Sequence, residues 1–232
     1  MKTCLLLAAA FLAASAALAG DIKIVAIRGD VQVRRGVHEQ WQTTAAGDVL
    51  KPEDSIKLEK RSSAVILLND KERFDLPGEA IIDLSDLRKL TQQDLLLMLT
   101  MERVRSVSRE RREDDLTVPR TSTVHGANRG ALPPPPPAGY TPGTFELNGT
   151  NFLYEHGFYA TCVLKTKEVL RLNPGLLKVV DARMRVASAL ERMSLTGEAA
   201  EEYSGLLSEQ MPPGERSMVE QKLAELKKAG NR

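Results

Sequence analysis

A proline-rich segment near the middle of the chain limits the folds available to it. Between residues 114 and 142 the breakers of regular structure are Pro119, Gly126, Gly130, Pro133–Pro137, Gly139 and Pro142. The five consecutive prolines favour a stiff polyproline II rod of about 15 Å, at about 3.1 Å per residue, and exclude a long helix. We therefore expect a linker over residues 116–142 that holds two folded bodies apart. A docking site for a proline-recognising domain is the less favoured interpretation.

The first residues have the features of a secretory signal peptide. Lys2 supplies a positive charge, residues 5–18 are apolar or small apart from Ser15, and residues 17–19 form a small-x-small cleavage site. The apolar run is short for a membrane anchor, the alternative interpretation, and no basic stop-transfer segment follows it. We expect residues 1–19 to be removed, no membrane span to remain after cleavage, and the protein to be periplasmic or otherwise exported.

The charge balance argues against a nucleic-acid partner. The chain has 32 Lys and Arg against 31 Asp and Glu, so loss of Lys2 leaves it formally neutral. Nucleic-acid binders are usually basic, and the aromatic content of 4% is low for base stacking. After cleavage one cysteine remains, Cys162, so we expect no internal disulfide.

Residues 20–90 have the alternation of short strands. Ile22 and Ile24 alternate with polar residues, as do Val31 and Val33. The turn signals between these runs are Gly29-Asp30, Gly36, Gly47-Asp48 and Pro77-Gly78. The run 64–68 is apolar throughout, which predicts a strand covered on both faces. A small all-β domain is expected here.

Residues 91–115 change to a helical period. Thr91 followed by Asp94 predicts a helix start. The predicted apolar face consists of Leu90, Leu97, Met101 and Val104. The mixed charges of residues 109–115 indicate a solvated helix end in preference to a binding patch.

Residues 143–232 are expected to be almost entirely helical. The predicted helices are 144–156, 159–172, 177–193, 197–209 and 215–229, separated by Gly157, Pro174-Gly175, Thr196-Gly197 and Pro212–Gly214. The sequon 148–150 is interpreted as a turn or helix start, not as a glycosylation site. The expected fold class is therefore an α+β multidomain protein: a β-domain, a helix, a proline-rich linker and an α-helical domain.

An ordered set of short elements runs through residues 24–84. In order they are Val25–Val33 with Gly29-Asp30, then Gly36, Trp41, Ala45, Gly47-Asp48, Leu50, Asp54, Ile56, Ser63–Leu68 and Asn69-Asp70. This set resembles the FecR domain, a bacterial extracytoplasmic module. The chain departs from the family at three turns, where it has Glu53-Asp54, Leu58-Glu59 and Asp70-Lys71. The resemblance implies a small β-module. It also opens the alternative of a FecR-type transmembrane signalling pathway.

Small and large residues recur at fixed spacing in the helical region, as Ala187-x-x-Leu190 and, twelve residues after Ala187, Ala199-x-x-x-Tyr203. This pattern resembles tetratricopeptide repeats, whose units of about 34 residues pack two antiparallel helices, and these residues belong to a second unit. In the first unit, residues 153–159 form the turn, Cys162 takes a small-residue position and Pro174 ends the unit. A last helix with Val219, Leu223 and Leu226 on one side suits a solubilising cap. The resemblance implies a partner-binding face near Tyr154, His156, Tyr159, Arg183 and Glu191.

Catalytic signatures are not found in the sequence. His38, His125 and His156 lie in separate predicted turns, and no metal-binding helix motif, nucleophile elbow or phosphate loop occurs. We expect Cys162 to be a buried packing residue and Trp41 to belong to the core. The prediction is a protein that is not an enzyme and that has no cofactor and no metal.

These expectations combine into an exported, non-enzymatic binding or scaffold protein of the bacterial cell envelope. The expected partner is a protein or peptide of the envelope. Peptidoglycan is a further candidate, because an envelope-polysaccharide-binding protein is the other alternative to a signalling component.

Overall fold

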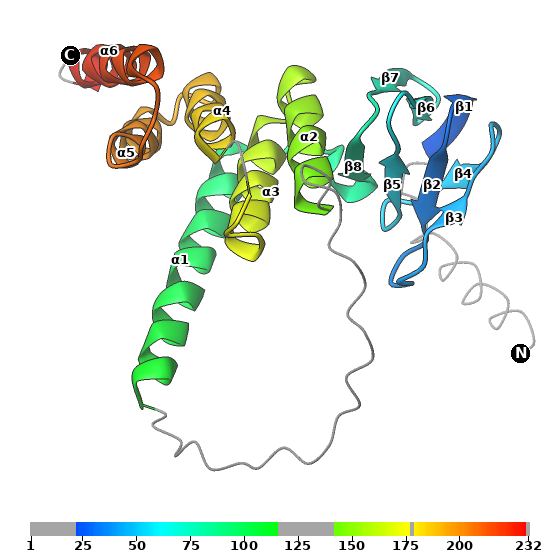
Figure 1. Ribbon diagram of the computed structural model, residues 1–232, viewed down its shortest axis with the longest axis horizontal. Coiled ribbons are helices and arrows are strands. Elements are labelled where there is room, and N and C mark those ends of the chain that lie inside the picture. Colours follow the sequence, from blue (N-terminus) through cyan, green and yellow to red (C-terminus); the bar gives the residue numbers. More distant parts are fainter. Residues whose placement is uncertain (1–21, 116–141, 177–178, 231–232) are drawn as a thin grey trace, which may run out of the picture. The chain divides into compact units, whose positions relative to one another are not determined.

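The computed structural model describes residues 22–115, 142–176 and 179–230. The predicted signal peptide and nearly all of the predicted linker 116–142 lie outside these residues. The chain divides into two units, one ending at Leu87 and one beginning at Arg88. The first contains strands and the second helices, so the predicted mixed α+β class is confirmed (Figure 1).

The first unit consists of two antiparallel four-stranded sheets. The first sheet has the order β4 (Val49–Leu50), β1 (Ile22–Arg28), β6 (Ser63–Leu68) and β7 (Glu72–Leu76). The second has the order β3 (Gln42–Thr43), β2 (Val31–Arg34), β5 (Ser55–Leu58) and β8 (Ala80–Asp83). A single 3-10 turn, η1 (Leu84–Asp86), follows β8.

Alternation along the strands supplies the core of this unit. Val31 and Val33 are buried while their neighbours in β2 are not, as the sequence predicts. Strand β6 was predicted to be covered on both faces. Instead, Ala64 and Ile66 are buried, whereas Val65 and Leu67, which point to the opposite face, are only half-buried. Ala64 and Ile66 on one face of the strand are thus covered, whereas Val65 and Leu67 on its other face remain partly open to solvent.

Two turns show how the sequence sets the strand connections. Gly29 has a φ of +80°, and a Cβ atom there would lie 2.5 Å from the Ser62 Oγ. That hydroxyl accepts a hydrogen bond of 2.8 Å from the Asp30 N–H, so this turn depends on close approach as well as on positive φ. The β6–β7 hairpin turns through Asn69 and Asp70, both with positive φ, as a type I′ turn requires.

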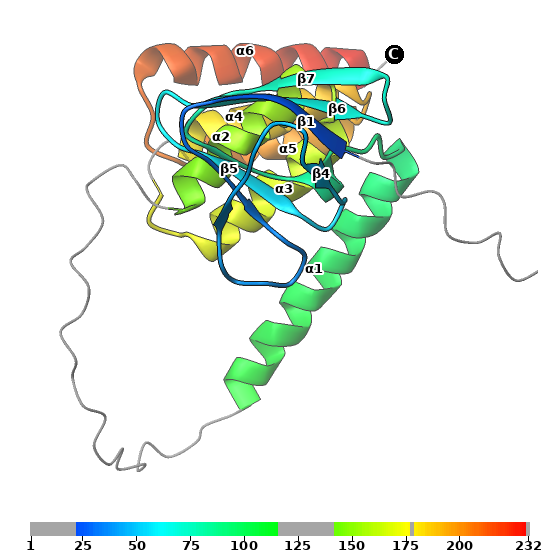
Figure 2. The ribbon, with the colours of Figure 1, turned by 90° about the vertical axis from the view of Figure 1, so that its right-hand side faces the viewer.

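The second unit begins with α1 (Gln92–Asp115), whose first half packs on other helices of the unit (Figures 1 and 2). Its predicted start is borne out by a capping box: the Thr91 hydroxyl accepts from the Asp94 N–H, and the Asp94 carboxylate accepts from the Thr91 N–H. Because α1 packs against α3 (Tyr159–Leu172), residues 116–142 connect two helices of one unit. This differs from the expected arrangement, in which they hold two bodies apart.

The predicted apolar face of α1 is only partly correct. Leu90, just before the helix, packs on the helical core as predicted, and the Val104 side chain lies outside the described part of the structure. Leu97 and Met101 are 62% and 49% exposed, whereas Leu95 is fully buried against helices of the second unit. Leu96 and Leu99 are partly buried beside Leu95. Residues 95–99 are apolar without interruption, so the sequence alone does not select which side of the helix packs.

The remaining helices follow one another as packed neighbours. They are α2 (Pro142–Glu155), α3, α4 (Val179–Arg192), α5 (Thr196–Leu206) and α6 (Pro213–Gly230). The predicted segments match these helices to within about three residues at each end, and Gly157 and Pro174-Gly175 lie between helices as expected. The other two predicted breaks are displaced, because Thr196-Gly197 begins α5 and Pro213-Gly214 begins α6. Gly149 and Thr150 do not mark a turn or helix start, because they lie buried inside α2.

Helix α6 ends the row of helices as the sequence predicts. Val219 and Leu223 are buried against α4 and α5, and Leu226 is partly buried. The charged residues around this apolar side are exposed or half-exposed. The helix therefore covers one end of the row and leaves a polar outer surface.

Candidate functional site

Helices α2 and α4 lie side by side and form the candidate binding face. The Tyr154 hydroxyl of α2 and the Ser188 Oγ of α4 are 2.7 Å apart. One turn earlier, Arg185 Nη1 donates to the Thr150 Oγ1 at 3.3 Å. The two residues of each pair are 34 and 35 positions apart in the sequence. Successive turns of α2 therefore contact successive turns of α4.

Three of the five predicted site residues lie at the end of α2 and the start of α3. The rings of Tyr154 and Tyr159 meet edge to face, with centroids 5.5 Å apart. His156 is exposed and stacks on Phe152, and its Nδ1 lies 2.9 Å from the Phe152 carbonyl oxygen. Both tyrosines also pack on the core around Leu95. The two tyrosine rings therefore also contribute to the packing of the helical core.

Arg183, the fourth predicted residue, is turned away from this group. It pairs with Glu202 at 3.6 Å and with Glu209, while Lys167 of α3 also pairs with Glu202. Gly205 of α5 leaves room for the guanidinium, because a Cβ there would lie 2.6 Å from the Arg183 Nη2. The network ties α3, α4 and α5 together.

Glu191, the fifth predicted residue, also has partners within the protein. Its carboxylate accepts a 2.6 Å hydrogen bond from the Tyr203 hydroxyl of α5 and pairs with Lys222 of α6 at 3.4 Å. Burial, together with the bond to Glu191, raises the pKa of the Tyr203 hydroxyl above its ordinary value. The structure thus brings Tyr154, His156 and Tyr159 into one region and uses Arg183 and Glu191 to join helices.

The sequence did not point to Arg185 and Ser188, which the structure places on the α2–α4 face. A signal was present in the spacing, since Ser188 follows Tyr154 by 34 residues, the unit length of the repeats that the helical region resembles. Cys162 is fully buried, and its thiol donates to the Thr150 carbonyl at 3.3 Å. This matches the predicted packing position and leaves the sulfur without access to solvent.

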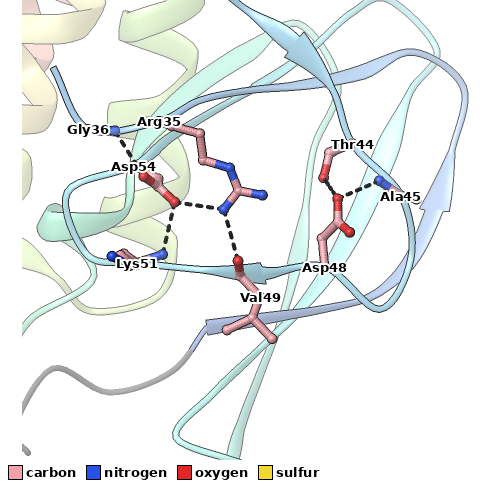
Figure 3. A network of polar contacts seen from close by, with 8 residues as sticks. All are labelled: Arg35, Gly36, Thr44, Ala45, Asp48, Val49, Lys51 and Asp54. Atoms are coloured by element: carbon pink, nitrogen blue, oxygen red, sulfur yellow. Dashed lines mark hydrogen bonds and ion pairs between the residues drawn. The ribbon is translucent and has the colours of Figure 1, made fainter. Parts of the chain in front are cut away.

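In the first unit a group of polar contacts surrounds Asp54 (Figure 3). This buried carboxylate accepts from the Gly36 N–H at 2.9 Å, the Lys51 N–H at 3.0 Å and the Arg35 Nη1 at 3.1 Å. Arg35 also donates to the Val49 carbonyl of strand β4. Asp54 therefore joins two loops, and its partners identify it as a structural group.

A second carboxylate in Figure 3 stabilises its own turn. Asp48 accepts from the Thr44 hydroxyl at 2.6 Å and from the Ala45 N–H at 3.0 Å. These two hydrogen bonds, the hydroxyl first, lower the pKa of Asp48 below its ordinary value. Asp48 thus supports the turn before β4.

Trp41 departs from its prediction, because it is half-exposed and lies outside the buried core. The Arg34 guanidinium lies 5.1 Å and the Lys57 ammonium 6.0 Å from its ring centroid. Arg34 is held in turn by the Ser55 hydroxyl and by Asp83, at 3.0 and 3.8 Å. The ring is thus packed against two cationic side chains.

Among the described residues, no group of three or more His, Cys, Asp or Glu side chains could hold a metal ion. In that same part of the chain no helix is long and apolar enough to cross a membrane.

Comparisons with protein-family models, with curated proteins and with solved structures give no significant match. The site must therefore be interpreted from its own residues.

Proposed function

We propose that the protein is an exported, non-enzymatic binding or scaffold protein of the bacterial cell envelope. The second unit acts as a short tetratricopeptide-like module that binds a protein or peptide partner. The first unit is a FecR-like β-module. The expected signal peptide supports export, and the two units supply two separate surfaces for binding.

The observation that carries this proposal is the offset between α2 and α4. Helices that stack at a separation of 34 to 35 residues are the arrangement expected of tetratricopeptide-like units. Such repeats present the first helix of each pair on one shared surface, which is where these solenoids bind extended ligands. Here that surface is the α2–α4 face, and α6 adds Lys222 beside Glu191.

The FecR-like interpretation of the first unit is supported by where its matching residues fall. Gly29, Gly47 and the Asn69-Asp70 pair, which belong to the matching set, have positive φ and lie in turns between strands. Ile56 and residues 64–68, also in that set, lie in strands β5 and β6. The set thus follows the alternation of strand and turn.

A capture experiment tests the proposal. The chain from residue 20 onward would serve as bait for a bacterial envelope extract, and bound proteins would be identified by mass spectrometry. Asn151→Trp places a bulky ring at a half-buried position of α2 next to Tyr154, and we expect it to abolish capture. Glu220→Trp, at an exposed position of α6, is the matched control and should retain the partner. Failure to recover any protein, or equal capture by both variants, would contradict the proposal.

A further inference from the structure

Arg185 is a half-buried cation on the α2–α4 face that has no carboxylate partner among the described residues. Its side chain is half-buried, and within the described residues its single hydrogen bond is the 3.3 Å contact from Nη1 to the Thr150 Oγ1. No carboxylate among those residues forms an ion pair with it. A guanidinium has five N–H donors in a planar fork, so most of its binding capacity is unused.

The other cations between the helices are satisfied differently. Arg183, two residues earlier on α4, pairs with Glu202 and Glu209. Lys167 pairs with Glu202 and Lys222 with Glu191. The helices thus supply carboxylates to the cations that join them, whereas Arg185, on the other side of α4, receives none.

The surroundings of Arg185 are suited to a polar ligand. Next to it lie the neutral hydroxyls of Tyr154 and Ser188, which are half-buried and can donate or accept hydrogen bonds. The third neighbour, Thr150, is fully buried, and its hydroxyl donates to the Leu147 carbonyl, so it orients Arg185 and does not face a ligand. Arg192 follows Arg185 by seven residues, or two helical turns, on the same side of α4, and is exposed. It also has no ion pair among the described residues.

Four carboxylates lie near the ends of this face, Glu146 and Glu155 on α2 and Asp181 and Glu191 on α4, and none of them forms an ion pair with Arg185. Glu191 is already paired with Lys222. Asp181 is exposed in the first turn of α4, one turn before Arg185. Glu155, at the end of α2, accepts a 2.7 Å hydrogen bond from the Asn151 amide. The centre of the face is therefore left with a cation and neutral hydrogen-bonding groups, which complements a negatively charged group of a partner.

We propose that Arg185 binds a carboxylate of the partner, so that the α2–α4 face selects a peptide segment rich in Asp or Glu. Arg192 provides a second contact two turns along the same segment. The planar guanidinium can engage both oxygens of a carboxylate at once, which gives orientation as well as attraction. This inference rests on the proposed binding function and specifies the chemistry of its ligand.

The test uses two fluorescent peptides, one of alternating Gly and Glu and one of alternating Gly and Gln, with the chain from residue 20 onward. Fluorescence polarisation should show about tenfold tighter binding of the Glu peptide, and weaker binding as salt is raised. Arg185→Gln should remove the preference, and Arg185→Lys should restore part of it. Lys227→Gln, which removes the same charge from an exposed position of α6, should leave it unchanged.

Equal binding of the two peptides, or no binding of either at about 1 mM, would overturn the inference. The capture experiment separates this result from failure of the proposed function. If a partner is no longer captured by Asn151→Trp but is still captured by Arg185→Gln, the proposed role of Arg185 is contradicted, whereas the binding function is supported. If no partner is captured by the unmodified chain, both proposals fail.

Discussion

Replacing Leu95 by Ala tests whether α1 is an integral part of the helical unit. Leu95 is fully buried among residues of α3, α4 and α5, which include Val163, Val186 and Ala199. Leu→Ala at such a site costs about 2–5 kcal/mol, because transfer free energy is lost and a cavity remains. For a unit of this size that corresponds to a fall in Tm of roughly 5–20 °C.

The matched control is Leu97→Ala on the same helix. Leu97 is 62% exposed, and Leu and Ala have similar helix propensities, so a change within about 0.5 kcal/mol is expected. The assay is thermal unfolding of both variants followed by circular dichroism at the helix band, supported by hydrogen exchange of α3. The reasoning is refuted if Leu97→Ala destabilises the protein as much as Leu95→Ala, or if neither changes the exchange of α3.

Three further predictions concern single contacts. Thr91→Ala removes the cap of α1 and should cost about 1 kcal/mol in urea unfolding, with Thr100→Ala on the exposed side of the helix as control. Gly29→Ala should destabilise the β-unit by about 1–3 kcal/mol and more than Gly47→Ala, because both have positive φ but only Gly29 faces Ser62; equal losses would contradict the role of this close approach. Hydrogen bonds lower the pKa values of Asp48 and Asp94 in the folded state. The stability that these two charged carboxylates contribute is therefore fully present above the unfolded pKa of about 3.9, and it is lost as pH falls through their lower folded pKa values. The urea midpoint should therefore fall less between about pH 5 and 3 in the Asp48→Asn, Asp94→Asn double variant than in the parent chain, and an equal fall would exclude these two carboxylates as the cause.

The sequence predicts local structure well where a few neighbouring residues decide it. The expected helix 159–172 coincides with α3, and Thr91 with Asp94 marks the start of α1. The side on which α1 packs was not predictable, because its apolar run 95–99 covers more than one face of the helix. Packing on α3 determines which of these residues are buried. Gly149 and Thr150 have poor helix propensity, yet burial between helices keeps them inside α2.

The candidate site was only partly predictable for a related reason. Tyr154 and Tyr159 lie five residues apart, and the turn between them brings their rings together. The hydrogen-bonded partners of Arg183 and Glu191 lie 12 to 31 residues away, on α5, on α6 and in the segment between them. Whether a charged side chain faces a ligand or a neighbouring helix depends on such distant partners, and the local pattern of residues does not contain them.

Because α1 packs on α3, the residues just before α1 join the β-unit to the helical unit, in place of the expected linker 116–142. Between Leu87, where the first unit ends, and Gln92, where α1 begins, there are four residues. A protease that cuts between residues 116 and 142 would therefore leave the β-unit covalently joined to α1, and α1 would remain held by the core around Leu95. Both fragments should then elute together in gel filtration, and they should separate when Leu95→Ala weakens that core.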